Sequence, residues 1–111
     1  MAPVLMGAKR PELSAELVTS FMRNDQGIAR HFARVTFLSD HRADLPRSTV
    51  PTLILQCSDD LIVPREVGDY MLRHLPDSCL QMIDDEGHCP HMSEPTASSQ
   101  AIDAFLARTL G

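Results

Sequence analysis

Two apolar runs in the second half of the chain constrain the fold more than any other feature. The segments TLILQC (residues 52–57) and SCLQMI (residues 78–83) lack the regular alternation of polar and apolar side chains that a half-exposed strand shows. Strands of this kind are typical of parallel sheets that are buried on both faces. We therefore predict two neighbouring parallel strands, over residues 51–56 and 79–83.

A proline follows each predicted strand at a place where a helix can begin. Pro64 and Pro95 each precede a segment whose apolar side chains recur with helical spacing. Proline is favoured in the first turn of a helix, so we predict helices over residues 65–75 and 95–109. The order of strand, helix, strand and helix is a βαβα unit at the edge of a parallel sheet. Two strands make a poor sheet by themselves, so we expect this unit to be the end of a larger α/β protein.

The first half of the chain shows helical patterns only. Pro11 suits the first turn of a helix over about residues 11–23, and Asn24 or Asp25 can cap a second helix over residues 25–38. The apolar side chains of each segment recur along one face. The short hinge between the segments indicates an antiparallel or V-shaped pair of helices.

The overall composition argues against several classes of function. The 111 residues suffice for one domain, and a net charge of −5 argues against binding to nucleic acid or to an anionic membrane surface. No apolar run has membrane-spanning length, and the run near the N-terminus is too short for a signal peptide. The three cysteines have no framework spacing, so we expect reduced thiols in a cytoplasmic protein.

Ionisable side chains follow both predicted strands. Asp59 and Asp60 come after the first strand, and His88 comes after Gly87 behind the second. In open α/β sheets, sites form at the carboxyl ends of the strands, so an aspartate and His88 can meet there. A carboxylate that binds one imidazole nitrogen leaves the other free to act as a base. Turn physics alone does not choose between the two aspartates, and an aspartate at such a place also serves as an ordinary turn residue.

A metal site is the competing interpretation of this region. Cys57, His88, Cys89 and His91 include residue types that bind zinc, but they form one short cluster without a matching second half. We expect His91 to hydrogen-bond within its own loop. The sequence therefore predicts no metal and no cofactor.

The same two loops carry a resemblance to a known family. The segment PTLILQCSDDLIVP, followed by EGHCPHMSEP, closely resembles the C-terminal part of the sigma-B regulator hydrolases of the RsbQ type. It is also similar to their plant relatives, the karrikin and strigolactone receptors. The segment IARHFARVTFLSDHRADL resembles the last lid helix of that family and its exit. The resemblance implies part of a helical lid over residues 1–45 and the C-terminal part of an α/β-hydrolase core over residues 46–111.

The resemblance also implies roles for individual residues. Asp60 and His88 match the acid and the base of a catalytic triad that hydrolyses, or senses, a small apolar ester or lactone-like molecule. In this family the inner face of the lid lines the substrate pocket. The resemblance therefore makes Phe32, Val35 and Phe37 candidate pocket residues. A place in the hydrophobic core is an equally good interpretation of these three. Ile62, in the loop after the first strand, is a further pocket candidate.

One departure from the family decides what this chain can do by itself. The five glycines, at positions 7, 27, 68, 87 and 111, form no G-x-S-x-G motif, so the serine nucleophile of the family is absent from these residues. We expect a C-terminal portion of such a hydrolase, from a truncated gene or a split chain, that is inactive alone. The expected partners are the missing N-terminal half or, for the RsbQ type, a PAS-domain phosphatase. The alternative is a non-catalytic interaction module that binds partners, or a second copy, through its lid helices and exposed sheet edge.

Overall fold

The computed structural model describes residues 10–110, and its sheet consists of two parallel strands. Strand β1 (Thr52–Asp59) pairs with β2 (Ser78–Glu86) in a register that runs from Thr52 opposite Ser78 to Cys57 opposite Ile83. The predicted parallel pair is therefore confirmed. Both strands continue beyond the predicted ends at residues 56 and 83. Backbone pairing between Asp59 and Glu86 extends them, after an irregularity in the register, and such pairing leaves no apolar pattern in the sequence.

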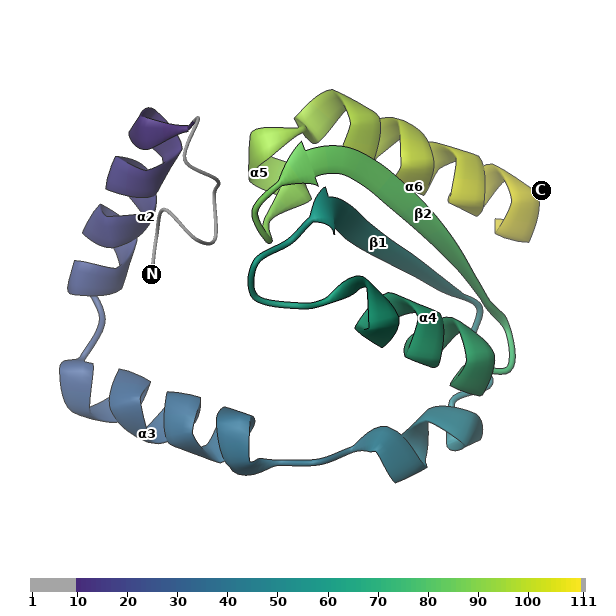
Figure 1. Ribbon diagram of the computed structural model, residues 1–111, viewed down its shortest axis with the longest axis horizontal. Helices are drawn as coiled ribbons and strands as arrows, with labels where there is room; N and C mark the ends of the chain where they lie inside the picture. Colours follow the sequence, from purple (N-terminus) through teal and green to yellow (C-terminus); the bar gives the residue numbers. More distant parts are fainter. Residues whose placement is uncertain (1–9, 111) are drawn as a thin grey trace.

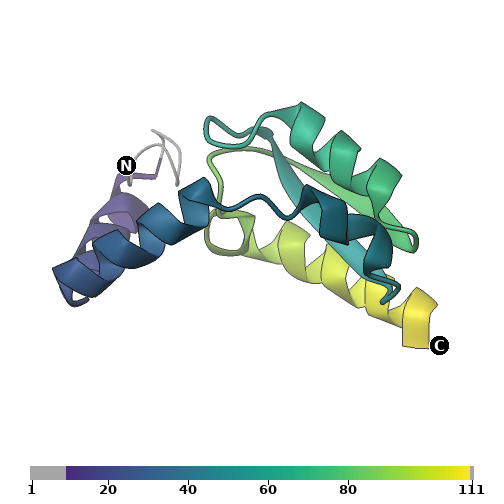
Figure 2. The same ribbon diagram turned by 90° about the horizontal axis from the view of Figure 1, so that it is seen from below.

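Two helices cover opposite faces of the sheet. Helix α4 (Arg65–His74) connects the strands, and α6 (Pro95–Leu110) ends the described chain. Figure 2 shows α4 on one side of the strands and α6 on the other. Both predicted helices are confirmed, and the α/β part has three layers. Among the described residues, four apolar side chains are buried and form the core: Ile54, Cys57, Leu75 and Ile83.

The segment after β2, which the sequence predicts as a loop, contains the short helix α5 (Pro90–Ser93). Pro90 occupies its first turn, where proline is favoured. The carbonyl of Cys89 accepts hydrogen bonds from the Ser93 amide, at 3.1 Å, and from the Ser93 hydroxyl, at 3.2 Å. This turn directs the chain from the end of β2 into α6.

Helices α2 (Pro11–Met22) and α3 (Gln26–Leu38) form a V-shaped pair, which is one of the two arrangements that the hinge predicts. The Asp25 carboxylate accepts a hydrogen bond of 3.0 Å from the Ile28 amide and so caps α3, as expected. The 3₁₀-helix η1 (Arg42–Arg47) lies in the connector between α3 and β1. In Figure 1 the pair stands away from the sheet, and neither helix contains a buried residue. Within residues 10–110, none of the helices has both the length and the apolar character needed to cross a membrane.

Candidate active site

Asp60 is the first residue after β1, and the backbone of its own loop holds its side chain. One carboxylate oxygen, Oδ1, accepts hydrogen bonds from the amide of Ile62, at 2.8 Å, and from the amide of Val63, at 3.0 Å. An aspartate at the start of a loop often bonds to the backbone that follows it. The side chain is only 4% exposed. Oδ1 is thus occupied by the loop, and Oδ2 is directed to another partner.

Gly87 brings His88 back toward Asp60. Its φ of 99° lies in the left-handed region, which glycine adopts without the strain that a side chain would cause. The amide of Gly87 donates to the carbonyl of Asp59 at 3.4 Å, so the loop after β2 is tied to the end of β1. The carboxyl ends of parallel strands meet at one edge of the sheet, and there the two loops come together.

The resulting contact joins His88 to Asp60. The distance between Nδ1 of His88 and Oδ2 of Asp60 is 2.7 Å. An imidazole that donates its Nδ1 proton to a carboxylate keeps Nε2 as an acceptor, so this histidine can take a proton from a nucleophile. The imidazole is 41% exposed, whereas the carboxylate is shielded. The shielded carboxylate thus orients the imidazole, an arrangement that can serve general-base chemistry.

The environment of Asp60 keeps it ionised. Burial raises the pKa of its carboxyl group, but the hydrogen bonds from His88 and from the amides of Val63 and Ile62 together outweigh burial. The pKa therefore lies below the ordinary value of 3.8. At neutral pH Asp60 is a carboxylate that can stabilise an imidazolium as His88 becomes protonated.

The competing pair does not form. Asp59 is exposed and is paired with Glu86 in the strand ladder, whereas His91 is exposed on α5. No hydrogen bond or ion pair joins Asp59 to His91 in the part of the chain that the structure describes. The structure thus brings Asp60 and His88 together and leaves the other two apart.

Two cysteine thiols near the pair are not ready nucleophiles. Burial, followed by the charges of Asp85 and Asp60, raises the pKa of Cys57 to about 11. Burial and the charge of Asp60 also raise the pKa of Cys89. A thiol of raised pKa is protonated at neutral pH and reacts slowly. Among residues 10–110, no three His, Cys, Asp or Glu side chains gather closely enough to hold a metal ion.

A cavity of about 380 Å³ adjoins the pair between β1 and α4. Asp60 and His88 line it together with apolar side chains such as Val63 and Met71. A hollow of this kind suits a small, mostly apolar molecule.

Most of the pocket residues predicted from the sequence lie elsewhere. Phe32, Val35 and Phe37 are on α3, with exposed fractions of 72%, 55% and 75%. They do not line the cavity beside His88, and α3 stands apart from the sheet in Figures 1 and 2. Ile62 is close to the pair, and its backbone amide donates to Asp60. Whether these four side chains contact a substrate stays a prediction.

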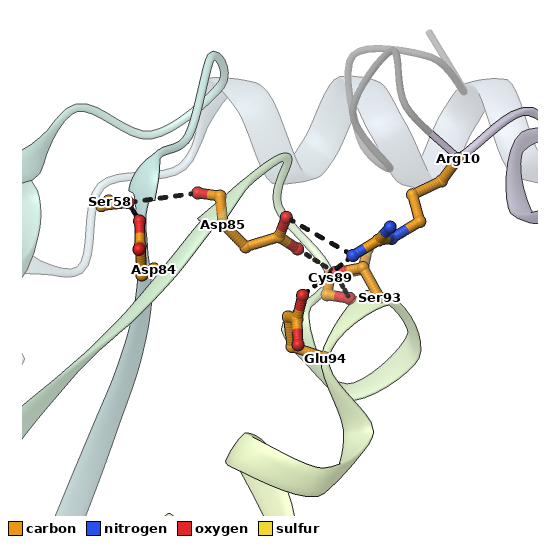
Figure 3. A network of polar contacts seen from close by, with 7 residues as sticks. All are labelled: Arg10, Ser58, Asp84, Asp85, Cys89, Ser93 and Glu94. Carbon is orange, nitrogen blue, oxygen red and sulfur yellow. Dashed lines mark hydrogen bonds and ion pairs between the residues drawn. The ribbon is translucent and has the colours of Figure 1, made fainter.

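A polar network that the sequence does not predict surrounds the base of the His88 loop (Figure 3). The hydroxyl of Ser93 donates to Oδ2 of Asp85 at 2.5 Å, which ties α5 to the end of β2. A guanidinium nitrogen of Arg10 lies 2.8 Å from Glu94 and 4.0 Å from Asp85. On the other side, the hydroxyl of Ser58 donates to the carbonyl of Asp85 at 3.3 Å. The network fixes both ends of the segment that carries His88.

The fold and the site together define a class of protein. A parallel strand followed by an aspartate, and a second strand followed by a glycine and a histidine, form the C-terminal part of an α/β hydrolase. Residues 32–109 match the family of TAP-like proteins within the α/β hydrolases, and the chain belongs to this family.

Individual relatives agree with this assignment. The chain is 32% identical over 108 residues to the strigolactone esterase RMS3 of Pisum sativum, and this alignment covers 96% of the chain and 40% of the relative. It is 29% identical over 101 residues to the putative carbamate hydrolase RutD of Pseudomonas syringae, covering 91% of the chain and 38% of that protein. The chain thus spans about two fifths of the length of these relatives.

A solved structure has the same fold over this region. The hydrolase olei00960 from Oleispira antarctica superimposes with a TM-score of 0.86 at 40% sequence identity. The match covers 94% of the present chain and 39% of the hydrolase.

Proposed function

We propose that this chain supplies the acid and the base of an α/β-hydrolase site that cleaves a small apolar ester or lactone-like molecule. The observation that supports the proposal most directly is the 2.7 Å contact between His88 and Asp60 beside an apolar cavity. The names of the relatives, which include strigolactone esterases, support the substrate class.

The nucleophile comes, in this proposal, from a polypeptide segment outside the 111 residues. These residues contain no G-x-S-x-G motif, and the pair at hand can activate a hydroxyl but cannot replace it. A serine placed at the mouth of the cavity would lie within reach of His88. The chain would then act as one part of a larger hydrolase.

The steps follow from the geometry of the pair. Nε2 of His88 takes the proton of the serine hydroxyl as its oxygen attacks the ester carbonyl, and Asp60 stabilises the imidazolium. The tetrahedral adduct collapses, the bond to the leaving alkoxide breaks, and His88 returns the proton to that oxygen. Water then attacks the acyl-enzyme with His88 again as base, which releases the acid and restores the serine.

A chimaera tests the proposal. The part of the Oleispira antarctica hydrolase that precedes the matched region is fused to this chain, and hydrolysis of p-nitrophenyl acetate is measured. We expect turnover from the chimaera and only the buffer rate from the 111 residues alone. In the chimaera, His88→Ala should lower turnover by about 10⁶-fold and Asp60→Asn by about 10⁴-fold.

Matched controls in the same chimaera separate the pair from its neighbours. His91→Ala and Asp59→Asn change the same residue types on exposed sites, so turnover should stay within a few-fold of the parent. A chimaera whose activity survives His88→Ala would overturn the proposal. So would equal losses from Asp59→Asn and Asp60→Asn.

A narrower proposal concerns the kind of hydrolase. The sequence resemblance favours the RsbQ type, with a PAS-domain phosphatase as its partner and a role in stress signalling. Co-purification of the chimaera with such a phosphatase would support this assignment. The absence of binding would leave a plain esterase role as the better description.

A second candidate function is a non-catalytic interaction module. Within residues 10–110 each strand has only one paired edge, and the apolar side chains of α3 are exposed. Unpaired strand edges invite pairing with another chain. Light scattering of the 111-residue protein should then show stable self-association, and an N-terminal hydrolase segment should not displace the second copy. Displacement by that segment would favour the catalytic proposal.

A further inference from the structure

Gln56 is a polar side chain in the interior of β1, where its neighbours are apolar. It is 6% exposed, beside the buried side chains of Ile54 and Cys57. Its Nε2 donates a hydrogen bond of 3.0 Å to the carbonyl of Pro64. Its Oε1 has no hydrogen-bond partner among residues 10–110. A buried polar atom without a partner destabilises a fold, so an aliphatic residue would pack there more favourably.

The hydrogen bond from Gln56 reaches the end of the loop that begins at Asp60. Pro64 is the last residue of this loop and caps α4, and its carbonyl also accepts from the amide of Val67 at 3.0 Å. Gln56 therefore attaches the start of α4 to the strand beneath it. The amides of Ile62 and Val63, which hold the carboxylate of Asp60, lie in the loop between the end of β1 and Pro64.

Gly68 provides the space that Gln56 needs. Gly68 is buried in α4, where glycine is unfavourable for a helix. A Cβ at this position would lie 1.9 Å from Oε1 of Gln56 and 2.9 Å from its Cδ. Since no real Cβ approaches that closely, a side chain at position 68 would displace Gln56 from its place under the helix. The glycine in α4 is thus explained by the buried amide of Gln56, which occupies the space that a side chain at position 68 would need.

We propose that Gln56 is a positioning residue, which sets the geometry of the Asp60 carboxylate toward His88 through the carbonyl of Pro64, and that Gly68 is its obligatory partner. This inference deepens the proposed function and rests on it, because Asp60 is the acid of the proposed hydrolase. The same cavity is lined by Gln56, Gly68, Asp60 and His88, which places all four in one unit.

Removal of the amide donor tests the inference in the 111-residue chain. In Gln56→Leu the loop is no longer fastened at Pro64, so the bonds from Ile62, Val63 and His88 to Asp60 should lengthen. We expect the pKa of Asp60 to rise toward 3.8. The ¹³C chemical shift of its carboxyl carbon, measured against pH, gives this pKa. The parent should show a downfield NMR signal for the His88 Nδ1 proton, because this proton lies in the bond to Asp60, and the variant should lose it. Gln56→Met keeps the length and lacks the donor, and it serves if the leucine variant does not fold.

Two controls distinguish positioning from general destabilisation. Gln81 lies on β2 with an exposed side chain, so Gln81→Leu makes the same chemical change away from the loop and should leave Asp60 unchanged. Gly68→Ala should reproduce the effect of Gln56→Leu by displacing the amide. In a Gln56→Ala background, where the obstructing atoms are gone, Gly68→Ala should add little.

The chimaera supplies a readout of catalysis. Gln56→Leu should lower kcat on the order of ten- to a hundred-fold, because the acid–base pair is misplaced, and should change KM much less, because the other residues that line the cavity remain. An unaltered Asp60 titration in folded Gln56→Leu or Gln56→Met would overturn the inference. If the parent chimaera is inactive, the proposed function fails, whereas the titration still decides the role of Gln56. An active chimaera with unaltered kcat in the Gln56 variants would refute the positioning role alone.

Discussion

The α2–α3 pair and the β1–α4–β2–α6 unit have similar apolar content but different surroundings. The unit buries Ile54, Leu75 and Ile83 between its layers, whereas the pair has no buried residue. Phe32 and Phe37 on α3 are 72% and 75% exposed. The comparison shows that an apolar stripe specifies where a helix forms but not what covers it.

Local contacts, rather than a hydrophobic core, stabilise the α2–α3 pair. Asp25 caps α3, and the side-chain amide of Gln26 donates to the carbonyls of Phe21 and Asn24, both at 3.2 Å, which fixes the corner. Ion pairs from Arg10 to Glu94, at 2.8 Å, and to Asp85, at 4.0 Å, connect the start of α2 to the α/β unit. The pair is therefore specified by its own sequence, and the unit by contacts between distant residues.

The largest expected effect concerns core packing, which differs between the two regions. Ile54→Ala should lower the free energy of unfolding by about 2–5 kcal/mol, because it leaves a cavity between β1 and the helices. Phe32→Ala removes a larger side chain from an exposed site and should change the same quantity by less than about 0.5 kcal/mol. Urea denaturation followed by circular dichroism measures both. Equal losses would show that α3 is packed in solution.

The next effect concerns pH and comes from Asp60, which lies in the α/β unit. Because hydrogen bonds lower the pKa of Asp60 in the folded state, its ionised form stabilises the fold above the unfolded pKa. That contribution should be lost as the pH falls from 3.8 through the lower folded value. Asp60→Asn should flatten this part of the profile of urea midpoint against pH. A profile that the substitution leaves intact would mean that the contact with His88 does not persist in solution.

A smaller effect should be confined to the pair. Asp25→Ala removes the cap of α3 and should destabilise this helix by about 1 kcal/mol. Amide hydrogen exchange should quicken along α3 and stay the same in β1 and β2. Asp25→Ser retains a capping oxygen and should behave nearly as the parent. Faster exchange in the strands would contradict the independence of the two regions.

The smallest effect tests the contact that joins the regions. Arg10→Ala breaks the ion pair with Glu94, which is partly exposed, so we expect a loss of roughly 0.2–1 kcal/mol that shrinks in high salt. Thermal melts at two ionic strengths measure it. Arg42→Ala breaks a more exposed ion pair with Asp40 within the connector and is the control. Exchange at the start of α2 should quicken only in the Arg10 variant.

Local signals account for what the sequence predicts correctly. The apolar runs and Pro64 and Pro95 predict the strands and both long helices, since each signal lies within the element that it specifies. The ends of the strands at Asp59 and Glu86 depend on pairing between segments and leave no local pattern. The choice of Asp60 over Asp59 came from the family resemblance, and in the structure the loop amides and His88 hold Asp60.

The polar network around α5 could not be predicted for the same reason. Arg10 and Glu94 are 84 positions apart, so no spacing rule connects them. The role of Gln56 is also invisible in the sequence, where it interrupts an apolar run without any sign that Pro64 accepts its hydrogen bond. Long-range polar contacts of this kind need the assembled fold, because several acceptors in the chain would serve each donor equally well.

The unequal exposure of His88 and Asp60 has a consequence for chemical labelling. Of these two groups, only the imidazole of His88 is accessible to reagents in solution, since it is 41% exposed and the carboxylate of Asp60 only 4%. An imidazole-selective acylating reagent such as diethyl pyrocarbonate can therefore modify His88 in the folded protein, whereas a carbodiimide has little access to Asp60. Asp60 becomes reactive only when the loops separate, so its modification would report their opening without any enzymatic assay.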